Sequence, residues 1–351
     1  MEVVIIGNGI SGITAARWLR KLSDAHITVI SSETEEFFSR TALMYIYMGH
    51  MRFEDTKPYE PWFWEKNRIT IQKDHVDKVD FKNKNLQLAS GKTRSYDKLV
   101  LALGSRSNKF GWPGQDLKGV GGLYHYQDLE NMEAYSSNLK RAVIVGGGLI
   151  GIEMAEMFAS RNISVSILVR ESDYWNNVLP AEESNMISRH IKKHHIDLKL
   201  GVNLQEIIDD GSGTASGVIV KETGETIECG YVGLTAGVSP NVDFLKDTQL
   251  NIERGIVVDN HLQTNVPDVY AIGDCAQLSD PQPGRRNIEA IWYTGRMMGE
   301  ALAQTICGKP RKYNPGHWFN SAKFLDIEYQ TYGWVFSERS KKDNEHHFHW
   351  R

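Results

Sequence analysis

Cysteine is rare in this chain of 351 residues. The three cysteines are Cys229, Cys275 and Cys307, and their spacing matches neither a Cys-x-x-Cys motif, a zinc-ligand pattern nor a disulfide framework. A reaction that cycles a pair of thiols is therefore not expected.

Long apolar runs and an excess of one charge are also missing. No run reaches the roughly 18 apolar residues of a membrane span, and the first apolar stretch begins at Val3, which leaves no room for a signal peptide. The formal net charge is only −4, so there is no basic field to hold nucleic acid. We expect a cytoplasmic protein without a membrane or nucleic-acid partner, and 41% hydrophobic residues suffice for two or three domains.

Glycine is plentiful, and its placement near the start is informative. An apolar run, Val3–Ile6, leads directly into Gly7, Gly9 and Gly12. This spacing predicts a strand, a tight turn and a helix whose N-terminus receives a pyrophosphate. Other glycine-rich turns share the pattern, so by itself it indicates a nucleotide site only weakly.

A helix over 13–22 and a second strand over 27–30 would complete the βαβ unit. An acid after that strand would hydrogen-bond the adenosine ribose, and Glu33 stands at about the right distance. Ser31 and Ser32 follow the strand directly, so the alternative is that Glu33 is a solvated loop residue.

Arg40 stands just before a helix that we expect to start near Thr41. Its guanidinium can pair with a cofactor phosphate or adenine, and the apolar residues behind it can face a flavin ring. The alternative is an amphipathic core helix with a surface arginine.

A hairpin or meander is expected around 76–81 and 85–88, before a buried parallel strand over 99–103. This strand ends at Gly104, where the chain can pass close to a cofactor and cross into another domain.

A second glycine loop follows the strand that begins at Arg141, with Gly146, Gly148 and Gly151 in the same spacing. Two nucleotide sites in one chain indicate electron transfer between two nucleotides. Glu153, in the first turn of the next helix, either reaches a nicotinamide amide or complements the helix dipole.

The next strand, over 165–169, ends where an NAD site often presents an acid. Arg170 stands there instead and can meet a 2′-phosphate, so NADPH is favoured, while the adjacent Glu171 keeps NADH open. A later strand over 231–236 leads into Gly237, where the chain returns to the first domain.

A carboxylate follows the strand expected over 269–272, because that strand ends in Gly273 and Asp274. Ligands bind at this end of a parallel sheet, so Asp274 can accept a hydrogen bond from a flavin ribityl chain, although Gly-Asp is also a common turn. A helix over about 288–306 would then direct its first residues toward the flavin, namely Ala290, Ile291 and Trp292.

Two groups of histidines resemble metal ligands at first sight. His194 and His195 stand among lysines without an acidic or cysteine partner at ligand spacing, which indicates a solvated face. His346, His347 and His349 belong to a polar tail. No metal site is expected.

Five segments together resemble the pyridine nucleotide–disulfide oxidoreductase superfamily. They are the two glycine loops, YDKLVLALGS over 96–105, LTAGVSPN over 234–241 and VYAIGD over 269–274. The resemblance implies an α/β fold with two Rossmann-like three-layer nucleotide-binding domains, the NAD(P)H domain inserted in the FAD domain, and a short C-terminal α+β interface segment. It also implies that Ala102, Gly104 and Gly237 lie near the cofactors.

The implied division has four parts: an FAD domain over 1–108 and 236–309, an NAD(P)H domain over 109–235, and a partial interface domain over 310–351. The stretch from His317 to Gly333 resembles the opening of the family's C-terminal domain, and few residues follow it. The two alternatives are an abbreviated domain and an incomplete chain.

Thr41 stands where the thiol-dependent branches of the superfamily carry a redox cysteine, in TALMYIY. The chain therefore looks like the branch of rubredoxin, ferredoxin and nitrite reductases, although Tyr45 replaces a lysine found near the flavin in some of them. The resemblance implies FAD, NAD(P)H as substrate and a small iron protein as acceptor, and a homodimer is left open. No catalytic side chain is expected.

Two other functions stay open. A type II NADH dehydrogenase would reduce quinone and would want an apolar C-terminal anchor, whereas this tail is polar. A flavin-bound signalling protein similar to apoptosis-inducing factor would want a basic face.

Overall fold

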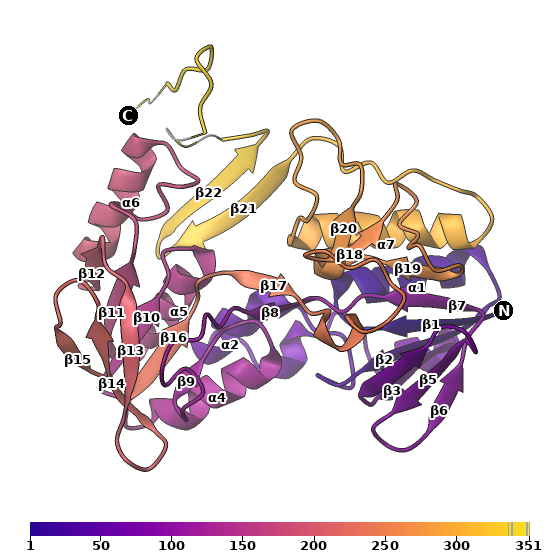
Figure 1. Cartoon of the computed structure of the whole chain (residues 1–351), viewed down its shortest axis with the longest axis horizontal. Coiled ribbons are helices and arrows are strands. Elements are labelled where there is room, and N and C mark those ends of the chain that lie inside the picture. Colours follow the sequence, from indigo (N-terminus) through magenta and orange to yellow (C-terminus); the bar gives the residue numbers. More distant parts are fainter. Residues whose placement is uncertain (336, 338–339, 349, 351) are drawn as a thin grey trace. The chain divides into compact units, whose positions relative to one another are not determined.

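A computed structural model gives the fold and describes residues 1–335, 337, 340–348 and 350 (Figure 1). His349, part of the predicted polar tail, lies outside the described residues. The chain divides into two compact units: unit 1 is Met1–Ala42, Met51–Arg106 and Ser239–Gly316, and unit 2 is Leu43–His50, Ser107–Val238 and His317–Arg351. The four-part domain division expected from the sequence stays a prediction.

Unit 1 is built on a parallel sheet of five strands. In spatial order they are β19 (Val269–Ala271), β7 (Lys98–Leu101), β1 (Glu2–Ile6), β2 (His26–Ser31) and β3 (Ile69–Lys73). The expected meander is an antiparallel sheet of β4 (Val76–Asp80), β5 (Asn85–Leu88) and β6 (Thr93–Ser95). A small parallel pair adds β18 (Ile256–Val258) and β20 (Ala276–Leu278).

The helices of unit 1 are α1 (Ile10–Leu22), α3 (Trp62–Lys66) and α7 (Trp292–Ile306). One continuous apolar core joins the parallel sheet, α1, α7 and the meander, with Ile5, Leu19, Leu86 and Leu302 all fully buried. The sheet strands are apolar on both faces, because both faces are covered.

Unit 2 repeats this plan. Its parallel sheet runs β9 (Val120–Gly121), β16 (Tyr231–Leu234), β10 (Arg141–Val145), β11 (Ser164–Val169) and β12 (Asp197–Leu200). Its antiparallel sheet is β13 (Leu204–Asp209), β14 (Ala215–Val220) and β15 (Thr226–Glu228). Its helices are α2 (Leu43–Tyr47), α4 (Tyr126–Ser136), α5 (Leu149–Ser160) and α6 (Ala181–Lys193).

Successive residues of β10 point alternately to the two faces of this sheet, and both faces are packed. Val143 and Val145 belong to the apolar cluster that contains the antiparallel strands, while Ile144 lies with Met154 of α5 against Gly233. A strand with period two and apolar residues on both faces is thus the middle of three layers. The α/β fold with two Rossmann-like units that the sequence predicts is confirmed.

The C-terminal part of unit 2 contributes a hairpin, β21 (Phe319–Phe324) and β22 (Ile327–Tyr332). It packs on α5, where Lys323 Nζ lies 2.8 Å from a carboxylate oxygen of Glu156. The segments that link the two units, β8 (Ser105–Ser107) and β17 (Val238–Pro240), pair with each other.

Both parallel sheets reverse their strand order at the same place. In unit 1 the chain proceeds outward from β1 through β2 to β3 and then returns to β7 on the other side of β1. In unit 2 it proceeds from β10 through β11 to β12 and returns to β16. Ligands of open α/β sheets bind at the carboxyl ends of the strands beside such a reversal.

Two predicted helix starts are wrong. The first helix begins at Ile10 rather than Ile13, because the backbone bond from Ile13 N–H to the Gly9 carbonyl already makes a helical turn. The last helix begins at Trp292 rather than near Ile288. Arg285 holds the Glu289 carboxylate in a buried ion pair, and Ile291 is extended, with φ −136° and ψ 141°.

In the described part of the chain, no helix has the length and apolar character that crossing a membrane requires.

Gly299 provides a test of the packing between α1 and α7. A Cβ at Gly299 would lie 2.6 Å from the Ser11 carbonyl oxygen and 2.9 Å from the Ala15 nitrogen. Alanine gains about 1 kcal/mol of helix propensity, but overpacking against backbone costs about 1–3 kcal/mol. We therefore expect Gly299→Ala to lower the denaturant midpoint of unfolding. Gln304→Ala, on the same helix, is the control, and equal midpoints for Gly299→Ala and the parent protein would contradict this packing.

Candidate functional site

The first glycine loop is shaped by close backbone contacts. Gly7 has φ +113°, and a Cβ there would lie 2.1 Å from the Ala102 carbonyl oxygen. A Cβ at Gly12 would lie 2.1 Å from the Gly7 carbonyl oxygen. At Gly9, by contrast, no described heavy atom lies within 4 Å of a Cβ position. The outer glycines are required by packing, and the middle one leaves the loop open to a ligand.

Helix α1 begins at this open point, with Gly9 as its N-cap. Gly9 has no side chain that could cap the first N–H groups of α1, and the first turn carries no acid. Uncapped N–H groups and the positive end of the helix dipole favour an anion. This backbone geometry suits a pyrophosphate, and its binding here stays a prediction.

Glu33 and Arg40 lie together beside this loop. Arg40 donates two hydrogen bonds to the Glu33 carboxylate, at 2.8 and 2.6 Å, and the two side chains are 28% and 12% exposed, respectively. Glu33 comes two residues after the end of β2, so it stands at the carboxyl edge of the sheet. The structure thus joins two residues that the sequence proposed separately.

Asn8 is a residue that the sequence analysis missed. Its side-chain amide is buried and donates to the Thr34 carbonyl oxygen at 3.0 Å. This bond ties the glycine loop to the segment that carries Glu33. The only signal in the sequence is a polar residue between two glycines, which many turns share.

Asp274 lies at the start of α1. The preceding Gly273 has φ +73°, and a Cβ there would lie 2.6 Å from the Ser11 hydroxyl oxygen, so this turn packs directly on the first turn of the helix. Asp274 itself is half-buried. Farther along, Ala290 is exposed, while Ile291 and Trp292 are half-buried at the start of α7.

The second glycine loop has the same geometry. Gly146 has φ +126°, and a Cβ there would lie 2.7 Å from the Thr235 carbonyl oxygen, while a Cβ at Gly151 would lie 2.4 Å from the Gly146 carbonyl oxygen. At Gly148, apart from its neighbours in the chain, no described heavy atom lies within 4 Å of a Cβ position. The buried Tyr174, also missed from the sequence, donates from its hydroxyl to the Gly148 carbonyl oxygen at 2.7 Å.

The sequence prediction that Glu153 lies in the first turn of its helix is wrong: α5 begins at Leu149, its first turn holds no acid, and Glu153 follows in the second turn. Burial raises the pKa of its carboxyl to about 7, and the neighbouring Glu156 carboxylate adds to the increase. Burial first, and then the Glu153 charge, also raise the pKa of the Tyr329 hydroxyl, which places this tyrosine in the same environment. Near neutral pH, Glu153 is therefore divided between a form that donates a hydrogen bond and a form that only accepts one.

Arg170 and Glu171 form an ion pair just after β11, with Arg170 Nε 2.6 Å from a Glu171 oxygen. Arg170 is 73% exposed, whereas Glu171 is 15% exposed. The strand registers make Glu171 equivalent to Glu33: Ile6 pairs with Ile30 and Val145 with Leu168, and each acid comes three residues after the second partner.

Gly104 and Gly237 end the strands that lie beside β1 and β10. Both have positive φ, +66° and +84°. The Asn108 side-chain amide donates to the Ala236 carbonyl oxygen at 3.2 Å, and its backbone N–H donates to Gly237. The chain can therefore approach a ligand at these turns without a side chain in the way.

The cysteines are poorly suited to redox chemistry. Burial raises the pKa values of both Cys229 and Cys275 to about 12, so neither forms a thiolate at neutral pH. Thr41 is exposed, and its hydroxyl oxygen lies 3.1 Å from that of Ser39. Cys229 and Cys275 are therefore poor candidates for a redox thiol, and the position of Thr41 offers none.

Comparison with known proteins supplies the family. A family model described as pyridine nucleotide-disulphide oxidoreductase matches residues 1–299. An NADH-rubredoxin oxidoreductase of Clostridium acetobutylicum is 30% identical over 316 residues, which cover 89% of this chain and 76% of that protein. An NAD(P)H nitrite reductase of Bacillus subtilis is 29% identical over 280 residues, which cover 79% of this chain but only 34% of that protein.

A crystal structure of a ferredoxin reductase from Rhodopseudomonas palustris matches the fold with a TM-score of 0.87. The two chains are 25% identical, and the match covers 94% of this chain and 81% of the other. The resemblance inferred from the glycine loops and the strand-end motifs is confirmed, and the chain belongs to the pyridine nucleotide-disulphide oxidoreductase family, whose members are FAD-dependent NAD(P)H oxidoreductases.

Proposed function

We propose that this chain is a reductase that passes electrons from NAD(P)H, by way of FAD, to a small iron protein of the ferredoxin or rubredoxin type. The observation that carries the proposal is the repeated loop geometry. Each unit has one glycine loop that is closed by backbone contacts at its outer glycines and open at Gly9 or Gly148. Two dinucleotide sites in one chain suit electron transfer between two bound nucleotides.

FAD would be held by unit 1. The N–H groups at the start of α1 would bind the pyrophosphate, Glu33 the adenosine ribose, Arg40 a phosphate or the adenine, and Asp274 the ribityl chain. The surrounding backbone would be supplied by Gly7, Gly9, Gly12, Thr41, Ala102, Gly104, Gly273, Ala290, Ile291 and Trp292. Bound FAD supplies the chemistry that divides the two electrons of a hydride into single electrons for an iron protein.

NAD(P)H would be held by unit 2. Gly146, Gly148 and Gly151 would cradle its pyrophosphate at the start of α5, and Gly237 would lie along the opposite strand end. Glu153 would hydrogen-bond the nicotinamide amide, because its half-protonated carboxyl can either donate or accept. In this role the residue orients the substrate and does not transfer a proton.

Arg170 and Glu171 would determine whether NADPH or NADH is preferred. The exposed arginine favours NADPH, which stays our prediction, while the equivalence of Glu171 to Glu33 favours the free ribose of NADH. The ion pair between them means that neither charge acts alone.

The nature of the acceptor rests on thiol chemistry and on similarity. Thr41 and the two buried cysteines argue against a disulfide or peroxide acceptor. The rubredoxin and ferredoxin reductases that the chain resembles are named for iron-protein acceptors. The four-part domain division and a homodimer belong to the same proposal.

Replacement of all three cysteines tests the electron path. We expect the variant Cys229→Ala, Cys275→Ser, Cys307→Ala to keep its flavin, to be reduced anaerobically by NADPH or NADH at the parent rate, and to reduce a rubredoxin or ferredoxin. Stopped-flow absorbance of the flavin and of the iron protein measures both steps. A folded, flavin-loaded variant that reduces no acceptor would show that a thiol is required, and reduction of quinone alone would overturn the iron-protein acceptor.

Charge changes at the ion pair test the nucleotide choice. Glu171→Gln should lower the KM for NADPH and raise that for NADH, because it frees Arg170 and removes a ribose acceptor. A charge-assisted contact of about 1.5–3 kcal/mol corresponds to roughly a tenfold to hundredfold change in the ratio of the KM for NADPH to the KM for NADH. Arg170→Ala should raise the KM for NADPH alone. Glu182→Gln, an equal charge change on the exposed start of α6, is the control, and equal effects on both nucleotides would exclude a selective role.

The titration of Glu153 has a stability consequence. Its pKa of about 7 in the folded protein lies above the ordinary value of 4.5, so the stabilisation from its bound proton is complete below about pH 4.5 and is lost as the pH rises through 7. At pH 8, Glu153→Gln should therefore raise the free energy of unfolding by about 1–3 kcal/mol, and at pH 5 it should change it little. Chemical denaturation at both pH values measures this difference.

Glu156→Gln is the matched control one helical turn away. It breaks the ion pair with Lys323 and should lower stability at pH 8. If Glu153→Gln had the same effect at both pH values, Glu153 would not titrate near neutrality. For the binding role, Glu153→Ala should raise the KM for NADH about fivefold to tenfold, the value of one hydrogen bond, while Glu153→Gln should not.

A further inference from the structure

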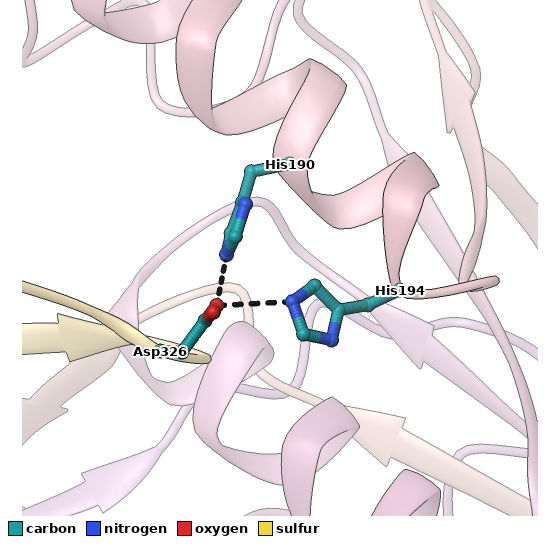
Figure 2. Close-up of side chains that lie close together, drawn as sticks. All are labelled: His190, His194 and Asp326. Carbon is teal, nitrogen blue, oxygen red and sulfur yellow. Dashed lines mark hydrogen bonds and ion pairs between the residues drawn. The ribbon is translucent and has the colours of Figure 1, made fainter.

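Three side chains in unit 2 that take no part in the proposed nucleotide sites converge on one point (Figure 2). His190 lies in the last turn of α6, His194 is the C-cap residue of that helix, and Asp326 lies in the turn between β21 and β22. The Nε2 atoms of both histidines contact the same Asp326 oxygen, His194 at 3.0 Å. One ligand atom from each residue lies within 4.8 Å of the other two.

We propose that His190, His194 and Asp326 bind a divalent first-row transition-metal cation, with Zn²⁺ as the best match. Imidazole nitrogen and carboxylate oxygen are the ligand atoms that such cations take, at about 2.0–2.2 Å. A cation would replace the shared contact at Asp326, because it binds the same three atoms from a point between them. Water would complete the coordination.

Both favourable and unfavourable charges surround the proposed cation site, and the favourable ones lie closest to the ligands. His194 is the C-cap of α6, and the free carbonyl groups at a helix C-terminus carry partial negative charge, which stabilises a cation. Lys192 and Lys193 oppose this, but both are exposed and screened by solvent. His190 is only 15% exposed, so its ring is already held in position before a cation arrives.

The bound cation would have a structural role: it would link the end of α6 to the hairpin of β21 and β22. Asp326 follows His190 by 136 residues in the chain and comes close to it only when the hairpin is docked. A ligand that binds only the folded arrangement stabilises it by mass action. The hairpin also carries Lys323, the partner of Glu156 on α5. The bound cation would therefore stabilise the packing of the hairpin on the helices of unit 2.

Zn²⁺ titration of the full-length chain, freed of metal by chelation, tests the proposal. The tail histidines, His346, His347 and His349, are replaced by glutamine throughout, because they offer a second imidazole source. Calorimetry should give one equivalent of Zn²⁺ bound, with a higher Tm and slower amide exchange in β21 and β22. Co²⁺ should give an absorption spectrum with the same stoichiometry, and millimolar Mg²⁺ should not compete.

Substitution of single ligands gives the decisive comparison. His190→Ala and Asp326→Asn should each raise the Kd for Zn²⁺ at least tenfold, since even loss of a residue that only supports a ligand costs about 10–100-fold. Both should also remove the increase in Tm. His195→Asn is the control: this residue adjoins His194 but stands outside the cluster, with φ +60°, a conformation that asparagine tolerates.

Two results would overturn the proposal. One is an equal Zn²⁺ affinity in the parent protein and in Asp326→Asn, which would mean an adventitious ion only. The other is binding that is lost equally in His195→Asn. Because every measurement concerns binding or stability, the result does not depend on whether the chain reduces an iron protein. Flavin absorbance verifies that each variant is folded.

Discussion

No side chain fits where the first strand of each parallel sheet turns into its helix. Gly7 faces the Ala102 carbonyl and Gly146 faces the Thr235 carbonyl, each across a gap too small for a Cβ. This contact draws the helix start onto the edge of the sheet where the strand order reverses. The two proposed nucleotide sites depend on it, because the N–H groups at the starts of α1 and α5 would meet a pyrophosphate only from that position.

The two units use equivalent positions differently. Glu33 and Glu171 occupy the same register position, and each is paired with an arginine. In unit 1 the arginine is Arg40, seven residues farther along, and the pair is mostly buried. In unit 2 it is the adjacent and exposed Arg170. In the proposed sites, the buried pair would be a preformed part of the adenosine site of FAD, whereas the exposed pair would open in response to a 2′-phosphate.

Burial raises the pKa values of both thiols and carboxyl groups in this protein, but the chemical consequences differ. It raises the pKa values of Cys229 and Cys275 so far that they are inert at neutral pH. The same desolvation moves the pKa of Glu153 into the physiological range. Burial therefore disfavours the thiolate form of Cys229 and Cys275, and it also gives Glu153 a carboxyl group that can either donate or accept a hydrogen bond.

The sequence by itself determined the two glycine loops, the apolar strands, the meander and the strand-end residue Asp274, because these depend on spacing within a few residues. Only the tertiary structure decided which charged groups meet. Arg285 and Glu289 meet in a buried ion pair just before α7, and Asp326 supplies His194 with the acidic partner that its own neighbourhood lacks. Local patterns specify backbone conformation, whereas contacts between distant residues depend on the path of the whole chain, which no short window of sequence contains.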